Sequence, residues 1–376
     1  MATVRMLRSL LHLFALLAVT CAALAISPAL AADNPGAVYV LTNQVSGNAV
    51  AVYTRAADGT LTLANTVATG GLGTGAALGS QGAVTLSDDG RWLVAVNAGS
   101  NDISVFDVQP NGLALVDRVP SGGTRPTSIT IRKQLVYVLN AGAEGNISGF
   151  RLGSDGHLVA LAGSTRSLSN AGVGAAPAPA QVSFSPSGDV LVVTERATNL
   201  LDVYNLDRDG MATGPTAYPS SGATPFGFAF TQQGTLVVSE AAGGAVNGSS
   251  VSSYAVSPAG LQVVTPSSPT GETAACWIAV SKNGKFAYSA NAGSASVSSY
   301  RVGQDGSLAL IAGKAGETGA GTAPVDMATS HNSQYVYVLS ARSQNVIVFA
   351  AGNDGSLTPI GTFGGLPAGS AGIAAW

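Results

Sequence analysis

Residues 276–312 read CWIAVSKNGKFAYSANAGSASVSSYRVGQDGSLALIA, and their pattern decides the fold. Small and apolar residues alternate with polar ones in four short runs, which is the two-residue period of a half-buried β-strand. Asn283-Gly284 separates the first two runs and Asp305-Gly306 the last two. Because such dipeptides between alternating runs indicate β-hairpins, the stretch predicts four antiparallel strands. The predicted strands are 276–281, 286–290, 296–302 and 308–312.

The same pattern recurs along the chain at intervals of about 49 residues. In each copy an aromatic residue ends the third run, and a glycine follows six positions later. The aromatic residues are Tyr53, Phe106, Phe150, Tyr204, Tyr254, Tyr300 and Phe349. A fixed period of this length indicates a repeat architecture in which each copy is one supersecondary unit.

The two ends of the chain complete one copy between them. The first copy lacks its first strand, since residues 37–41 already read as a second strand, and residues 371–376 (AGIAAW) are typical of the missing one. Joining the ends would close the ring and remove exposed sheet edges. We therefore predict an all-β, seven-bladed β-propeller with four antiparallel strands per blade, whose first blade is closed by the C-terminal strand.

The composition excludes several other classes of protein. Only 10% of the residues are charged, whereas disordered chains need high charge and few apolar residues. Glycine accounts for 48 of 376 residues, which disfavours a helical bundle. The formal net charge of −3 gives no basic face for nucleic acid, so we expect no nucleic-acid partner.

The N-terminus is typical of a secretory signal peptide. Arg5 and Arg8 precede an apolar run over residues 10–26, and Ala29-Leu30-Ala31 is a small-x-small cleavage site. We expect residues 1–32 to be removed and residues 33–376 to form the propeller. The alternatives are a short membrane anchor and lipidation at Cys21. Cleavage predicts a secreted or periplasmic monomer that has no membrane contact and no intramolecular disulfide, because Cys276 would be its one cysteine.

The loop pattern predicts where a site lies. In a propeller the first strand of each blade lines the central channel. The hairpin turns are short and lie on one face, whereas the loops between blades are long and lie on the other. Binding usually uses long loops on a rigid scaffold, although these loops could equally be spacers. The longest predicted loops are 67–82, 163–180, 214–225 and 313–324.

Polar residues near the channel are the candidate site residues. Near the first strands they are Gln81, Arg125, Gln181, Trp277 and Asp326, and at the ends of the second strands they are Glu195, Arg196, Glu240 and Arg342. The positions that end the second strands read Asn43, Asn97, Asn140, Glu195, Glu240, Asn291 and Ser340. Their oxygens could hold Ca²⁺, but asparagine at a strand end more often bonds its own turn. We expect no cofactor, with Ca²⁺ as the alternative.

Histidine placement disfavours two common kinds of catalytic site. His157 and His331 both fall in hairpin turns, away from the long loops. A Ser-His-Asp triad or a histidine-ligated zinc is therefore not expected at the long-loop mouth. Cys276 begins a predicted inner strand, where a buried structural thiol is the expected role.

The repeats resemble those of the lactonase-family propellers, which include 6-phosphogluconolactonase and the fungal 3-carboxymuconate lactonizing enzyme. The resemblance runs from residue 38 to the C-terminus and rests on four motifs. The motifs are LSDDGR at 86–91, YVLN at 137–140, FSPSG at 184–188 and SVSSY at 296–300.

The resemblance also implies site residues, and the chain departs from them. The family often begins an inner strand with Gly-Pro-Arg-His, where this chain has Ala-Pro-Ala-Gln ending at Gln181. Only Glu195 matches the family's acidic position, so it would be the catalytic base, with Arg196 or Arg125 holding an anion. We favour a propeller with a degenerate site that binds a small molecule, an extracellular protein or a glycan. The alternative is a secreted lactone hydrolase that uses Glu195.

Overall fold

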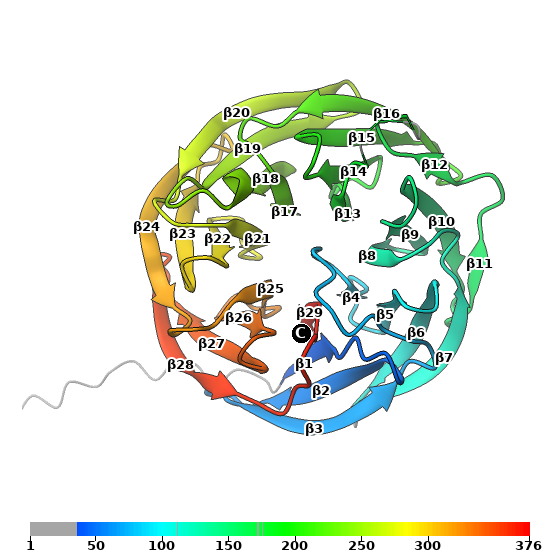
Figure 1. The fold of residues 1–376 in the computed structure, drawn as a ribbon, viewed down its shortest axis with the longest axis horizontal. Helices are drawn as coiled ribbons and strands as arrows, with labels where there is room; N and C mark the ends of the chain where they lie inside the picture. Colours follow the sequence, from blue (N-terminus) through cyan, green and yellow to red (C-terminus); the bar gives the residue numbers. More distant parts are fainter. Residues whose placement is uncertain (1–35, 111, 171–172, 175) are drawn as a thin grey trace, which may run out of the picture. The chain divides into compact units, whose positions relative to one another are not determined.

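The computed structural model describes residues 36–110, 112–170, 173–174 and 176–376. These residues form seven antiparallel sheets arranged as the blades of a ring around a central channel (Figure 1). The predicted seven-bladed propeller is therefore confirmed. The predicted signal peptide over residues 1–32 lies outside the described residues. Among the described residues, no helix has the length and apolar character to span a membrane.

From the channel outward, the strands of the first four blades are as follows. Blade 1 is β29 (Ile373–Ala375), β1 (Gly36–Leu41), β2 (Ala49–Arg55) and β3 (Leu61–Ala68). Blade 2 is β4 (Val84–Leu86), β5 (Trp92–Asn97), β6 (Asp102–Gln109) and β7 (Gly112–Pro120). Blade 3 is β8 (Pro126–Arg132), β9 (Leu135–Asn140), β10 (Asn146–Leu152) and β11 (Leu158–Ala160), with β12 (Arg166–Ser167) also on β10. Blade 4 is β13 (Pro179–Phe184), β14 (Val190–Glu195), β15 (Leu200–Leu206) and β16 (Ala212–Pro219).

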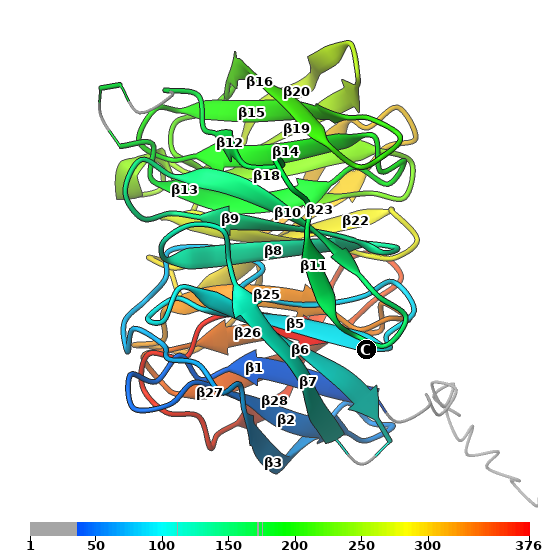
Figure 2. The same cartoon turned by 90° about the vertical axis from the view of Figure 1, so that its right-hand side faces the viewer.

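The last three blades follow the same order. Blade 5 is β17 (Pro225–Phe230), β18 (Thr235–Glu240), β19 (Ser250–Ser257) and β20 (Gly260–Pro269). Blade 6 is β21 (Ala275–Val280), β22 (Phe286–Asn291), β23 (Ser296–Val302) and β24 (Leu308–Glu317). Blade 7 is β25 (Pro324–Thr329), β26 (Tyr335–Ser340), β27 (Asn345–Ala351) and β28 (Leu357–Phe363). Figure 2 shows that outer strands such as β7 and β11 run steeply across inner strands such as β8, which is the usual twist of a sheet.

The ring closes as predicted, through the C-terminal strand. β29 pairs antiparallel with β1, so that Ile373 faces Val40 and Ala375 faces Val38. The N–H of Trp376 adds a further bond to the carbonyl oxygen of Ala37, at 2.9 Å. Residues from the two ends of the sequence therefore form one blade.

The repeated aromatic residues and the repeated glycines recur for two different structural reasons. The aromatic side chains lie inside the third strands of the blades and are all at most 3% exposed. The glycines have positive φ and lie in the hairpin turns or at the first residue of the fourth strand, for example Gly59 and Gly156, both at 87°. A Cβ on Gly156 would lie 2.5 Å from the Trp92 ring of the preceding blade. Each of these glycines therefore combines a left-handed backbone with contact between blades.

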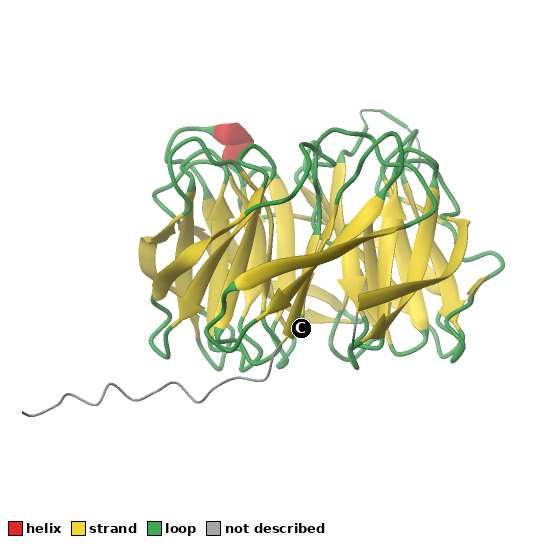
Figure 3. Cartoon of the chain, turned by 90° about the horizontal axis from the view of Figure 1, so that it is seen from below, coloured by secondary structure: helices red, strands yellow, loops and turns green. Residues whose placement is uncertain are grey.

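The loops lie on two opposite faces of the ring (Figure 3). The long-loop face carries the loops between blades, the loops between second and third strands, and the short helix η1 (Ala242–Gly244). Two predicted long loops are shorter than expected, because β16 continues to Pro219 and β24 to Glu317. These outer strands tolerate glycine and proline since much of their surface is exposed. The predictions of loops at 214–225 and 313–324 were to that extent wrong.

Candidate functional site

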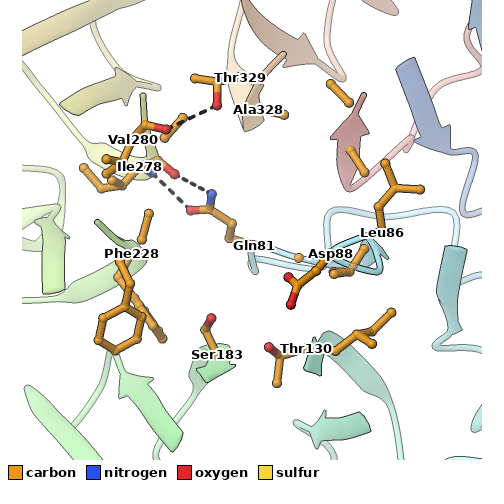
Figure 4. Close-up of a pocket in the computed structure, with 18 of the residues that line it drawn as sticks. Gln81, Leu86, Asp88, Thr130, Ser183, Phe228, Ile278, Val280, Ala328 and Thr329 are labelled. Atoms are coloured by element: carbon orange, nitrogen blue, oxygen red, sulfur yellow. Dashed lines mark hydrogen bonds between the residues drawn. The ribbon is translucent and has the colours of Figure 1, made fainter. Parts of the chain in front are cut away.

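Two cavities lie in the described part of the ring. One has a volume of about 670 Å³, and the turns between first and second strands surround it, so it opens on the hairpin face (Figure 4). The other has a volume of about 220 Å³, and loops of the long-loop face line it. We call them the hairpin-face cavity and the long-loop cavity. Sequence reasoning considered only the long-loop mouth, yet the larger cavity lies at the other end.

Residues 78–82 of the loop before β4 enter the channel and lie between these cavities; we call them the channel segment (Figure 1). Gln81 reaches the backbone of blade 6: its Nε2 donates to the carbonyl oxygen of Ile278 at 2.7 Å, and its Oε1 accepts from the Ile278 N–H at 3.1 Å. Ser80 accepts a bond from the indole N–H of Trp277 at 3.1 Å. The channel segment is thus bonded across the channel to β21.

The polar residues near the starts of the inner strands bond to neighbouring segments. A β-bulge precedes Gln181, Trp277 and Asp326 in their strands, and bulges redirect the side chains that follow them. Gln181 donates to the carbonyl oxygen of Phe228 at 2.9 Å and accepts from the Phe228 N–H at 2.7 Å. These predicted binding residues are therefore engaged in bonds between blades or to the channel segment.

Asp326 is a buried carboxyl at the inner end of the hairpin-face cavity. It accepts backbone bonds from the N–H groups of Met327 at 2.8 Å and of Ile373, in the closing strand, at 3.2 Å. Burial raises the pKa of Asp326 to about 7, although these bonds and one from Gly82 act in the opposite direction. Asp326 thus connects blade 7, the closing strand and the channel segment.

Glu195 is fully buried and its carboxylate is occupied. It accepts from the N–H of Ser169 at 3.0 Å, the hydroxyl of Ser169 at 2.7 Å and the hydroxyl of Thr198 at 2.5 Å. It lines neither cavity. Beside it, Asp202 is also fully buried, and burial followed by the hydrogen bond and charge of Glu195 raises the pKa of Asp202 to about 9. The catalytic role of Glu195 stays a prediction.

Glu240 occupies the corresponding position in blade 5. It accepts from the backbone N–H of Gly222 at 2.8 Å and from the hydroxyl of Ser252 at 2.6 Å. The hydroxyl of Ser250 donates to its other oxygen. Its carboxylate therefore holds the end of its own blade, and like Glu195 it is 0% exposed.

Two of the asparagines that end second strands behave in the same way. Asn97 donates to the carboxylate of Asp102 at 2.6 Å and to the hydroxyl of Ser104 at 2.8 Å, all within blade 2. Asn291 makes the matching bonds to Ser296 and Ser298 in blade 6. No group of three or more histidine, cysteine, aspartate or glutamate side chains that could hold a metal lies within the described residues. Calcium binding stays an untested alternative.

Arg125 and Arg196 both line the long-loop cavity. The Nε of Arg196 donates to the carbonyl oxygen of Ala178 at 3.0 Å, and its guanidinium lies 4.9 Å from the centre of the Phe226 ring. Burial lowers the pKa of Arg196, and the charge of Arg125 lowers it further. Two of the predicted binding residues are therefore brought together, in a cavity that they make electropositive.

The two histidines of the described residues, His157 and His331, lie on the hairpin face, as the sequence indicated. His157 is exposed and its Nδ1 lies 3.5 Å from the carboxylate of Asp117. His331 lines the hairpin-face cavity and stacks on Trp376 with ring centres 4.3 Å apart. A histidine is therefore available at a channel mouth, although not at the mouth that the sequence analysis considered.

Sequence reasoning missed Asp202, Lys282 and Trp376. Asp202 follows Glu195 by seven positions, where the corresponding blades 2 and 6 have Ser104 and Ser298, so comparing the repeats could have revealed it. Nothing in the sequence showed that Lys282 and Trp376 line a cavity. The structural role expected for Cys276 agrees with its 7% exposure, and burial raises the pKa of its thiol to about 12.

The fold and its channel define a seven-bladed β-propeller. The chain belongs to the lactonase family of seven-bladed β-propellers, whose model matches residues 30–167, 145–260 and 250–371. No curated protein matches it.

Three solved structures share the fold. The Pseudomonas aeruginosa periplasmic gluconolactonase is 19% identical with a TM-score of 0.71, covering 91% of this chain and 99% of that one. A Bacteroides uniformis protein assigned provisionally as a 6-phosphogluconolactonase is 18% identical with a TM-score of 0.72, covering 92% and 100%. A Lactobacillus plantarum protein is 18% identical with a TM-score of 0.73, covering 91% and 99%.

Proposed function

We propose that this propeller is a binding protein whose long-loop cavity takes a small monocarboxylate. The observation that carries the proposal is the convergence of Arg125 and Arg196 on one cavity. Glu144 also lines it, so the three charged groups sum to about one positive charge. A ligand with a single carboxylate would match that charge, and the volume of about 220 Å³ suits a compact molecule.

Arg196 is the central residue of this proposal. Its Nε is bonded to Ala178, which fixes the plane of the guanidinium, and Phe226 supports one side of that plane. Within the described residues its terminal nitrogens make no hydrogen bond, so a carboxylate could approach them in the two-bond geometry that arginine favours. Since burial and Arg125 both disfavour its charged form, a bound anion would relieve that cost.

Catalysis by Glu195 is the alternative, and family membership is what favours it. Hydrolysis would require Glu195 to activate water within reach of a substrate. The Glu195 carboxylate instead accepts three bonds and lines neither cavity. We therefore place binding ahead of lactone hydrolysis.

The place of action is part of the same proposal. The basic start, apolar run and small-x-small site in residues 1–32 support export, so we propose that the ligand is met in the periplasm or outside the cell. Fusing residues 1–32 to a reporter enzyme that is active only after export would test this. A reporter that stays in the cytoplasm would contradict it.

Calorimetric titration tests the binding proposal. We expect acetate or lactate to bind the chain from residue 33 onward, and Arg196→Gln to weaken binding at least tenfold, about 1.4 kcal/mol. Arg208→Gln is the control, because Arg208 is exposed in a turn of the opposite face. No binding, or an equal loss in both variants, would refute the proposal.

A lactone-hydrolysis assay tests the alternative, catalysis by Glu195. Glucono-δ-lactone and γ-butyrolactone would be incubated with the native protein and with Glu195→Gln. We expect the same background hydrolysis in both. Turnover that is lost in a Glu195→Gln variant with a native circular dichroism spectrum would establish the hydrolase instead.

A further inference from the structure

The hairpin-face cavity is a candidate second site, independent of the long-loop cavity. Its volume of about 670 Å³ lies within the usual range of small-molecule pockets. The inner strands of all seven blades contribute to its wall, and the channel segment lies at its inner end. A ligand would therefore enter from the hairpin face alone.

The cavity wall is less polar toward a ligand than the residue types that line it suggest. The hydroxyl of Thr85 donates to the carbonyl oxygen of Ile129 at 2.9 Å, and that of Thr329 to Val280 at 3.2 Å. The hydroxyl of Thr130 accepts from a backbone N–H at 3.2 Å. Because these groups already bond neighbouring blades, they offer a ligand few free hydrogen bonds, and about half of the exposed lining is apolar. Figure 4 shows the side chains around the cavity, which include Leu86, Phe228, Ile278 and Val280.

The rim carries a cation on one side. Lys282 and His331 belong to turns of blades 6 and 7, and these turns touch, since the N–H of Lys282 donates to the hydroxyl of Ser333 at 2.5 Å. On another part of the rim Arg132 and Asp88 pair with each other at 3.0 Å. Lys282 forms no ion pair with any of the described residues. The charge available at the rim is therefore positive.

The inner end of the cavity disfavours an anion. The carboxyl of Asp326 lies there, and Gln81 and Gln181 are held by backbone groups. A ligand with an apolar body and one anionic group would thus place the body inward and the anion beside Lys282. Trp376, stacked on His331 at the rim, would contact the body.

We infer that the hairpin-face cavity binds an organic anion with a compact apolar or aromatic body, whose carboxylate or sulfonate lies at the rim beside Lys282. This site differs from the long-loop cavity in its face of the ring, its size and its residues. Failure of either proposal leaves the other intact.

The probe for this site is 1-anilinonaphthalene-8-sulfonate, an aromatic anion that fluoresces in apolar surroundings. Trp376 is the natural reporter, because Trp92 and Trp277 are 7% and 5% exposed whereas Trp376 lies in the cavity wall. We expect saturable binding of one probe per chain, with energy transfer from tryptophan that falls at least twofold in Trp376→Phe.

Three variants locate the probe. We expect Lys282→Gln to weaken binding at least fivefold and Ala328→Phe, which fills the cavity, to abolish it. Lys285→Gln is the matched control, since Lys285 ends the same turn but does not line the cavity. Circular dichroism checks that each variant is folded. No saturable binding, equal effects of the two lysine changes, or a loss only in Arg196→Gln would each overturn the inference.

Discussion

The carboxyl groups of Glu195 and Asp202 lie together inside blade 4, and both side chains are 0% exposed. Two ionised carboxylates so placed would repel each other and could not share a hydrogen bond. Asp202 therefore holds a proton at neutral pH, beside the Glu195 carboxyl group that accepts bonds from the N–H and the hydroxyl of Ser169.

This pair predicts a pH dependence of stability. The pKa of Asp202 is about 9 in the folded chain against an ordinary value of 3.8, so its contribution to stability is fully present below pH 4 and is lost as the pH rises toward 9. We expect Asp202→Asn to raise the free energy of unfolding at pH 8 by about 2–3 kcal/mol. It should change little at pH 4.

Urea denaturation from pH 4 to 9 would measure this difference. Asp202→Ser, which restores the residue found at the matching position of blade 2, should flatten the same pH profile. A profile parallel to that of the native chain in both variants would show that Asp202 does not titrate in this range.

The second prediction concerns the hydrogen bonds by which Asp326 connects blade 7 to the closing strand. Asp326→Ala leaves the buried N–H groups of Met327 and Ile373 without their acceptor, so we expect a loss of about 2–4 kcal/mol. Thr329→Val, on the same strand, removes one bond to Val280 and should cost about 1 kcal/mol. Hydrogen exchange at Ile373 should be faster in Asp326→Ala alone. Unchanged exchange there would argue against this role.

The turn glycines allow a matched pair of substitutions. Gly355 and Gly234 have φ of 88° and 94°, so alanine is strained at both. At Gly355 the new Cβ would also lie 2.6 Å from Ile311 and 2.7 Å from Phe286, whereas at Gly234 it would meet nothing within 4 Å. We expect Gly355→Ala to cost about 3 kcal/mol and Gly234→Ala about 1 kcal/mol. Equal melting temperatures would contradict the packing argument.

The channel segment should protect Cys276 from reagents. The thiol is buried and its pKa is raised to about 12. Gln81 lies close to the backbone of Cys276, since a Cβ added at Gly227 would lie 2.0 Å from Gln81 and 2.7 Å from the carbonyl oxygen of Cys276. We expect the native chain from residue 33 to react very slowly with Ellman's reagent at pH 8. Gln81→Ala should react at least tenfold faster, because its channel segment loses both bonds to Ile278. Gln109→Ala, on the exposed end of β6, is the control.

The blades were predictable because the sequence of each repeat contains recognisable turn residues. Asn-Gly and Asp-Gly pairs between alternating runs gave the hairpins, and the runs at the two ends gave the closure between β29 and β1. The path of residues 78–82 was not predictable, since a glycine-rich loop has no period and its place depends on backbone groups of distant blades. Sequence reasoning did place Gln181 near the channel, but the bulge that turns it toward Phe228 is a feature of the backbone.

The closure of blade 1 also concerns how the chain reaches its fold. β29 and β1 pair residues that lie more than 330 positions apart, such as Ile373 and Val40. Contacts of such long sequence separation form slowly, because the chain loses the entropy of ordering the intervening residues before the contact stabilises the fold. Until they form, β1 presents an unpaired strand edge to any other chain. The last few residues of the sequence thus determine how long this protein remains vulnerable to aggregation during folding.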